Sequence, residues 1–333
     1  MSEGESENFT AIKPYPNEPK LFVIAAIIST FAWLHFIVGT VGMSLAILGV
    51  FFLVYLFVQS GFVSHLRGTG ALVSSEQFPD IHAAVERCAK RFQFKKTPTV
   101  YILHMNGMFN AFALRFLRQN YIVLLSDIVD AMDENPDALN FYIGHEMGHL
   151  HRNHNFWAAF LSPALILPLL GAGYSRAREY TCDRYGAACC DSLQSVRFGL
   201  AALAVGGKKC ATLDQDAYLQ QVQQSKGFWM SFHELIADYP WLVKRFARVN
   251  PKEQTKIPKR NPFAYVFAIF VPQLSVMSFI VLYGAVILWG GFFQGQDLIW
   301  QAKENGAMYE QNMNGDMDVN PELNSYQNSF ENR

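Results

Sequence analysis

The sequence is poor in charge, and its longest apolar stretch has none at all. Only 17% of the 333 residues are charged, against 51% hydrophobic, and the net charge is −1. Residues 21–64 contain no Asp, Glu, Lys or Arg. Because about 20 apolar residues suffice to cross a bilayer, this stretch could cross twice. A Gly-Thr-Val-Gly break at 39–42 predicts transmembrane helices over 21–39 and 43–63 joined by a tight turn. The alternative is a pair of buried core helices.

The chain also lacks a cysteine pattern. Its five cysteines are odd in number and form no Cys-x-x-Cys pair: Cys88, Cys182, Cys189, Cys190 and Cys210. They indicate neither the disulfide framework of a small secreted domain nor a thiolate zinc site, and they fit a reducing cytoplasmic domain. The N-terminus lacks the basic segment of a signal peptide, since it begins acidic and polar. We therefore expect the first apolar helix to be an uncleaved anchor.

A third stretch without charge covers residues 263–293. Pro272 and Gln273 interrupt it, so we expect the spanning part at about 273–293, with a second hairpin as the alternative. The segment before it is basic and opposed only by Glu253; its cations are Lys244, Arg245, Arg248, Lys252, Lys256, Lys259 and Arg260. The positive-inside rule places this side in the cytoplasm. Membrane topology explains the basic run, so no nucleic-acid partner is expected.

Residues 64–260 are enough for one compact domain. Helical spacing over 78–92 and short β-branched, aromatic runs at 99–104 and 121–125 predict a helix and two strands. Asn135 and Pro136 are typical of a helix start, and an apolar helix follows. The order predicts an α+β domain with a small sheet over that helix. The predicted boundaries are a polar segment 1–20, a transmembrane hairpin 21–63, the domain 64–260, a membrane segment 263–293 and a polar, disordered tail 294–333.

The apolar helix carries His145-Glu146-Met147-Gly148-His149, a His-Glu-x-x-His motif. On a helix, positions i and i+4 project from one face, so two imidazoles can bind one metal ion while the Glu leans toward its open side. This is the arrangement of a zinc hydrolase. A zinc site of this kind needs a third protein ligand and leaves the fourth position to water.

Two nearby histidines are poor candidates for the third ligand. At 100° per residue, His151 lies about 120° and His154 about 180° round the helix from His145, so neither can join unless the helix breaks. We expect both to be exposed or hydrogen-bonded on the helix surface. The metzincin class is rejected as well, because Arg152 and Asn155 stand where it requires Gly and His.

A better candidate lies downstream in Ser175-Arg-Ala-Arg-Glu-Tyr-Thr-Cys-Asp183. Glu179 and Asp183 are four residues apart on a predicted helix, so one carboxylate can bind the metal while the other holds the free N–H of a ligand histidine. The alternative is a solvated acidic helix face.

The HEMGH and SRAREYTCDRYG segments, a later Pro-x-x-x-x-Arg and two transmembrane helices ahead of them resemble the HtpX-like zinc metallopeptidases, relatives of the CAAX prenyl proteases. The resemblance covers roughly residues 20–250. It implies a membrane-anchored, gluzincin-like α+β zincin, mainly helical, with a small sheet next to the active-site helix and about three transmembrane helices.

The resemblance also implies roles for single residues. His145, His149 and Glu179 would bind one Zn²⁺ per chain, Glu146 would be the general base, and Asp183 would hold a ligand histidine. The tetrapeptide Asn110-Ala111-Phe112-Ala113 matches the family's strand-edge motif, where the substrate backbone would pair.

Three departures from the family pattern stand out. Cys182 replaces the usual Ala before Asp183, a small-residue change. Relatives often carry His-Pro where this chain has Tyr239-Pro240, so our hypothesis is that the Tyr239 phenol donates to the oxyanion, helped by Arg245; the alternative is a packed aromatic ring. Only residues 156–173 separate the two zinc motifs. This segment must return to the same side, so it dips into the bilayer, lies on its surface or is buried beside the catalytic helix.

The sequence thus predicts a membrane-bound zinc metalloendopeptidase with a cytoplasmic catalytic domain, expected in a bacterial inner membrane. Its partners would be the lipid bilayer and protein or peptide substrates, including unfolded or membrane proteins, and family analogy indicates protein quality control. Two alternatives remain. The first is a selective processing or CAAX-type protease, and the second is a non-catalytic, zinc-binding membrane scaffold.

Overall fold

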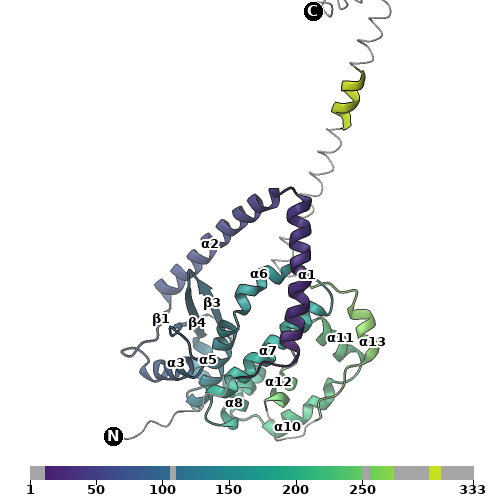
Figure 1. Ribbon diagram of the computed structural model, residues 1–333. Coiled ribbons are helices and arrows are strands. Elements are labelled where there is room, and N and C mark those ends of the chain that lie inside the picture. Colours follow the sequence, from purple (N-terminus) through teal and green to yellow (C-terminus); the bar gives the residue numbers. More distant parts are fainter. Residues whose placement is uncertain (1–11, 106–109, 250–255, 274–299, 309–333) are drawn as a thin grey trace, which may run out of the picture.

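The computed structural model describes residues 12–105, 110–249, 256–273 and 300–308, and it is mainly helical with one small sheet (Figure 1). The elements of its first half are α1 (Asn17–Gly39), α2 (Met43–Thr69), β1 (Ala71–Leu72), α3 (Pro79–Arg91), β2 (Thr99–Leu103), β3 (Ala111–Phe116), β4 (Gln119–Leu125), α4 (Ser126–Ala131) and α5 (Pro136–His151). They are followed by α6 (His154–Leu165), α7 (Leu170–Cys189), α8 (Leu193–Val205), α9 (Gly207–Cys210), α10 (Gln215–Gln220), η1 (Gln221–Ser225), α11 (Phe228–Ile236), α12 (Leu242–Arg248) and α13 (Pro262–Ala268).

The two predicted apolar helices are present as α1 and α2, which rise from the domain and meet at a turn (Figure 1). Val41 and Gly42 both have positive φ in that turn, +51° and +79°, and glycine adopts this conformation without strain. Their most apolar windows are only 11% and 6% buried. Apolar side chains exposed on this scale disfavour the alternative of buried core helices. Both helices are long and apolar enough to cross a membrane.

The sheet has the strand order β1-β2-β4-β3, and β3 forms one of its edges. Strands β2 and β4 are parallel, whereas β3 runs antiparallel to β4 with Ala113 opposite Ile122. Side chains of β4 alternate between two clusters, because successive strand residues point to opposite faces. Ile122 and Leu124 join the core formed with α5, and Tyr121 and Val123 join the cluster that contains the end of α2.

Helix α5 carries the HEMGH motif and is buried along most of its length. The expected cap at Asn135 is at the right place, but its side chain makes no capping hydrogen bond. Its Oδ1 accepts from the Ser195 hydroxyl instead. The Asp137 carboxylate accepts from the backbone N–H groups of Asp191 and Ser192, so a charge in the first turn ties α5 to the start of α8.

Three glycines allow α5 and α7 to approach each other closely. A Cβ on Gly186 of α7 would lie 2.6 Å from the Phe141 carbonyl oxygen of α5. A Cβ on Gly144 would lie 2.8 Å from the Tyr185 carbonyl oxygen, and one on Gly148 would lie 3.1 Å from the Tyr185 Cβ. Because backbone atoms are among these neighbours, no side-chain rotation could relieve the clash at Gly186 or Gly144.

The short segment between the two motifs forms α6 and a turn. Helix α6 packs against α1, where the Ser29 hydroxyl and the Trp33 indole N–H donate to the carbonyls of Leu161 and Phe160. The chain then reverses, and α7 begins at Leu170. Both motif helices therefore lie side by side, and protein covers one side of the connecting segment. The expected third membrane span and most of the tail lie outside the described residues.

We predict that Gly186→Ala separates α5 from α7. Overpacking of this kind costs about 1–3 kcal/mol, so the thermal midpoint of the purified protein should fall by several degrees. Gly173→Ala on the same helix is the matched control, because its Cβ would meet two side-chain ends at ordinary contact distance, Leu21 Cδ1 at 3.7 Å and Arg176 Nη2 at 3.9 Å. The higher helix propensity of Ala should leave stability equal or greater. Equal midpoints for the two variants would contradict the prediction.

Candidate metal centre

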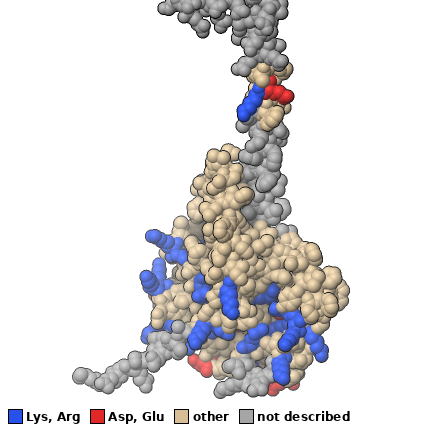
Figure 2. Space-filling model, turned by 45° about the vertical axis from the view of Figure 1, so that its right-hand side comes forward, with Lys and Arg blue, Asp and Glu red and all other residues tan. Residues whose placement is uncertain are grey.

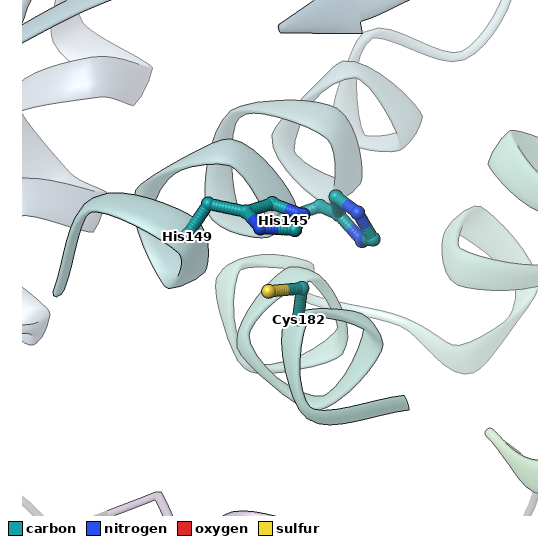
Figure 3. A group of neighbouring side chains, drawn as sticks. All are labelled: His145, His149 and Cys182. Atoms are coloured by element: carbon teal, nitrogen blue, oxygen red, sulfur yellow. The ribbon is translucent and has the colours of Figure 1, made fainter. Parts of the chain in front are cut away.

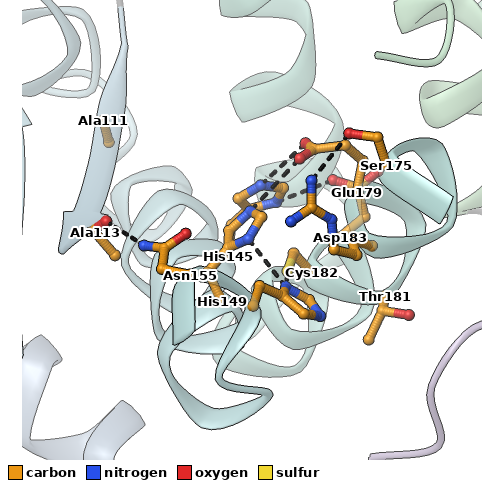
Figure 4. A network of polar contacts seen from close by, with 12 residues as sticks. Ala111, Ala113, His145, His149, Asn155, Ser175, Glu179, Thr181, Cys182 and Asp183 are labelled. Carbon is orange, nitrogen blue, oxygen red and sulfur yellow. Dashed lines mark hydrogen bonds and ion pairs between the residues drawn. The ribbon is translucent and has the colours of Figure 1, made fainter. Parts of the chain in front are cut away.

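The candidate site lies between α5 and α7 (Figure 4), and Arg245 of α12 adjoins it. The His145 Nε2 atom lies 3.4 Å from Glu179 Oε2, and the His149 Nε2 atom lies 3.5 Å from Glu179 Oε1. The side chains of these residues are between 7% and 16% exposed. Two imidazole nitrogens and a carboxylate thus converge, and this donor set fits the catalytic zinc sites of proteins.

Asp183 lies behind His145, one helical turn after Glu179. Its Oδ1 atom is 3.2 Å from His145 Nδ1, the ring nitrogen that points away from Glu179. Arg245 of α12 donates to both Asp183 oxygens, from Nε at 2.9 Å and from Nη2 at 2.6 Å. Its Nη1 atom lies 3.7 Å from Glu179 Oε2. A carboxylate that holds the second nitrogen of a histidine fixes the ring's orientation, and here an arginine fixes the carboxylate.

Burial and charge shift the ionisation of these groups. Burial raises the pKa of Glu146 to about 7. Burial lowers the pKa of His145, but contacts with Asp183 and Glu179 outweigh it and raise the value to about 9. Burial would raise the pKa of Glu179, but the neighbouring histidines and Arg245 hold it well below its usual range. Glu179 therefore stays ionised, as a metal ligand must.

The predicted substrate segment occupies the edge of the sheet next to α5. Asn110 is exposed, and Ala111, Phe112 and Ala113 lie in β3. Both backbone groups of Ala113 in β3 contact side chains outside the sheet. Its N–H contacts the Glu146 carboxylate, and its carbonyl accepts a hydrogen bond from the Asn155 amide at 2.9 Å (Figure 4). The edge strand and the motif helix are thereby joined at one residue.

Tyr239 and Arg245 differ in their exposure and in their contacts with the site. Tyr239 lies between α11 and α12 and is 65% exposed. The negative charge of Glu179, followed by partial burial, raises the pKa of Tyr239, so its hydroxyl keeps its proton. Arg245 was expected to help stabilise an oxyanion, but it is 6% exposed and two of its nitrogens donate to Asp183. Arg245 is therefore placed to position Asp183.

Comparison with known proteins agrees with this geometry. Residues 75–167 match the family model described as Peptidase family M48. The M48 match is consistent with the resemblance to HtpX-like peptidases. The matched segment includes the elements β2 to α5, with the HEMGH motif, and it ends before Glu179 and Asp183. Four of the proposed site residues therefore lie outside this match: Glu179, Asp183, Tyr239 and Arg245.

One curated relative is similar over part of its length. The chain is 26% identical over 173 residues to "Plastoglobule-localized metallopeptidase 48, chloroplastic" from Arabidopsis thaliana. The similarity covers 47% of this chain and 49% of the relative, so the chain spans about half of that protein. No solved structure matches the chain.

The prediction for His154 was wrong. Asn153, with φ +55°, ends α5 and starts α6, so His154 folds back and is 1% exposed. Its Nδ1 atom lies 3.0 Å from His149 Nδ1, and its Nε2 atom lies 3.2 Å from a carboxylate oxygen of Glu18 in α1. Arg152 also pairs with Glu18, at 3.0 Å. His154 and Glu18 thus support His149 by hydrogen bonds, as Asp183 and Arg245 support His145.

Cys182, expected only as a small-residue change in the motif, lies next to both histidines. Its sulfur and ring nitrogens of His145 and His149 lie within 4.8 Å of one another, and the three side chains face the same space (Figure 3). Burial raises the pKa of Cys182 well above its usual value, whereas Glu179 is held ionised between both histidines. The carboxylate is therefore the better third ligand. The sequence could have indicated that Cys182 lies near the site, because it follows Glu179 by three residues and so shares a helix face with it.

His151 remains outside the centre, as expected. Its Nδ1 atom lies 2.9 Å from the Tyr185 hydroxyl, on another side of α5. It is a hydrogen-bonded surface residue.

We predict that Glu18→Gln weakens zinc binding about 10-fold, because outer partners of ligand histidines contribute on that order. Zinc affinity of the purified chain would be measured by competition with a chelator. Glu234→Gln is the matched control, since Glu234 is also a buried, ion-paired acid but pairs with Lys244 and Arg260. If both variants bind zinc like the unmodified chain, Glu18 does not support His149.

Proposed function

We propose that the chain is a membrane-anchored, zinc-dependent metalloendopeptidase. The observation that carries the proposal is the convergence of His145, His149 and Glu179 beside the buried carboxylate of Glu146. The M48 match, which implies a metallopeptidase, supports it. Zinc bound there would supply a water of near-neutral pKa and would polarise the scissile carbonyl.

The chain's own groups would carry the proton transfers. Glu146 lies in a buried position and has a pKa of about 7, close to the value at which a general base works best at neutral pH. In this proposal its carboxylate takes the proton of the attacking water and delivers it to the leaving amine. The Ala113 N–H on Glu146 keeps this carboxylate beside the strand that would hold the substrate.

Two further residues would stabilise or position charged groups of the site. The Tyr239 hydroxyl, which keeps its proton, would donate to the oxyanion that forms at the scissile carbonyl. Arg245 would not touch the substrate. It would hold Asp183 and, through Asp183, the ring of His145.

The substrate would pair with the edge of β3 near Asn110 to Ala113. Pairing with a strand edge reads backbone more than side chains, so it favours extended, unfolded or flexible chains. This preference supports a role in protein quality control. A selective processing protease remains the second candidate within the same chemistry.

We propose that 21–63 is a membrane hairpin, 64–260 the peptidase domain and 263–293 a third membrane segment. The start of α1 and the end of α2 both adjoin the domain, which supports a hairpin that enters and leaves the membrane on one side. The basic residues on this side support a cytoplasmic domain. The bacterial inner membrane remains an expectation, since the curated relative is described as plastoglobule-localised.

We predict that Glu146→Gln abolishes cleavage of casein while zinc content stays at one ion per chain. Loss of a general base lowers turnover by about 10²–10⁴-fold, and Glu146 is not among the proposed ligands. A strong chelator should abolish the activity of the unmodified chain, and added zinc should restore it. Full zinc content without cleavage by any preparation of the unmodified chain would favour the non-catalytic scaffold instead.

We predict that Tyr239→Phe lowers kcat about 10²-fold with little change in KM, because the lost hydrogen bond would form only in the transition state. Tyr218→Phe is the control, since Tyr218 packs against Phe246 away from the site. Zinc affinity should be unchanged in both variants. Unchanged turnover in Tyr239→Phe would leave Tyr239 as a packed aromatic ring.

A further inference from the structure

A second pocket lies on the other side of α7 from the metal centre. It has a volume of about 530 Å³. Helix α7 contributes Arg176, Ala177 and Tyr180 to its wall, whereas Glu179 and Asp183 face the metal centre. The start of α1, helices α11 to α13 and residues 257–260 complete the wall. The pocket is therefore separate from the proposed peptidase site.

The pocket carries an excess of positive charge. Its cations are Arg176, Lys244, Arg248, Lys259 and Arg260, and Glu234 is the only carboxylate among the described residues of its wall. Both oxygens of Glu234 are taken, one by Lys244 at 2.5 Å and the other by Arg260 at 2.8 Å.

The other three cations have no carboxylate partner within the described part of the chain. Arg176 donates to the carbonyl groups of Leu235 and Ala237. Arg248 lies over the ring of Tyr180, 4.6 Å from its centroid. Burial, followed by the charge of Arg260, lowers the pKa of Arg176 to about 10. The cations thus repel one another across the pocket, and an anion placed between them would remove that repulsion.

The pocket lies where the apolar helix α1 meets the polar domain. Leu21 of α1 and Tyr265 of α13 line it. Beyond it, the surface is apolar: Phe31 of α1 is 69% exposed and Phe263 of α13 is 69% exposed. Figure 2 shows basic side chains on the lower part of the domain and none on the tan projection directly above it. If α1 enters a membrane, the pocket is at the level of the lipid headgroups.

We propose that this pocket binds the phosphate of an anionic lipid headgroup in the leaflet where α1 begins. Guanidinium groups suit phosphate oxygens, and a volume of this size is ordinary for a small-molecule site. Leu21, Leu169 and Tyr265 give the pocket an apolar side that continues into the exposed surface of α1, which would accept the start of an acyl chain. The proposal rests on the membrane placement of α1, and not on peptidase activity.

The test uses the full chain in a neutral detergent. Phosphatidylglycerol, phosphatidylcholine and inorganic phosphate are titrated separately, and bound lipid is counted by native mass spectrometry. We expect phosphatidylglycerol to bind about 10-fold more tightly than phosphatidylcholine, since each basic residue at the headgroup level adds to the attraction of an anionic lipid. Inorganic phosphate should bind weakly and compete poorly.

Variants distinguish the pocket from general surface charge. The double variant Arg248→Gln, Lys259→Gln should lose the 10-fold preference. The matched control is Lys208→Gln, Lys209→Gln, which removes the same charge from exposed residues of α9 outside the pocket and should keep the preference. Lys259→Gln alone alters only an exposed side chain, so it serves if the double variant does not fold, and it should lose part of the preference.

Three results would overturn the proposal. The first is equal binding of the two lipids by the unmodified chain. The second is an equal loss of preference in the pocket variant and the control, which would indicate diffuse charge. The third is inorganic phosphate that competes as well as the lipid, which would indicate a site for soluble anions. Casein cleavage is measured separately, so a chain that fails to cleave but keeps the lipid preference would contradict only the proposed function.

Discussion

The close approach of α5 and α7 is the constraint on which the rest of the structure depends. Catalytic zinc needs ligand atoms from two helices at one point, and the distance between the helix axes decides whether Glu179 reaches both histidines. Gly144, Gly148 and Gly186 permit that distance because a side chain at any of them would meet the opposite helix. One of these glycines lies inside the HEMGH motif, so the same five residues supply both the ligands and the contact that positions them.

Helix α1 is part of the support of the candidate metal centre. Each histidine has a carboxylate behind it, but the two carboxylates come from different parts of the chain. Asp183 follows Glu179 on α7, whereas Glu18 stands at the start of α1 and reaches His149 through His154. Helix α6 packs along α1 and so keeps His154 in place. The hairpin is therefore joined to the site by hydrogen bonds as well as by the chain itself.

Periodicity and local motifs predicted the two apolar helices, the motif helix, strands near β2 and β4, and Glu179 opposite the histidines. These features depend on residues close together in sequence. The features that were missed depend on single backbone angles or on distant pairs. One left-handed residue, Asn153, reverses the chain and brings His154 to His149. The pairing of Arg245 with Asp183 and of Glu18 with His154 spans 62 and 136 residues. Periodic patterns depend on residues close together in sequence, so they cannot predict such contacts.

The edge strand β3 also bears on how the molecule stays apart from its neighbours. An open strand edge is a template for pairing with other chains, and proteins that expose one risk aggregation. Here the outward N–H of Ala113 contacts Glu146, and its outward carbonyl accepts from Asn155. A strand of another chain could not pair with β3 at Ala113 without first breaking its contacts with Glu146 and Asn155. Any chain that pairs with β3 at Ala113, a substrate included, would therefore first have to displace these two contacts, which disfavours pairing with unrelated strand edges.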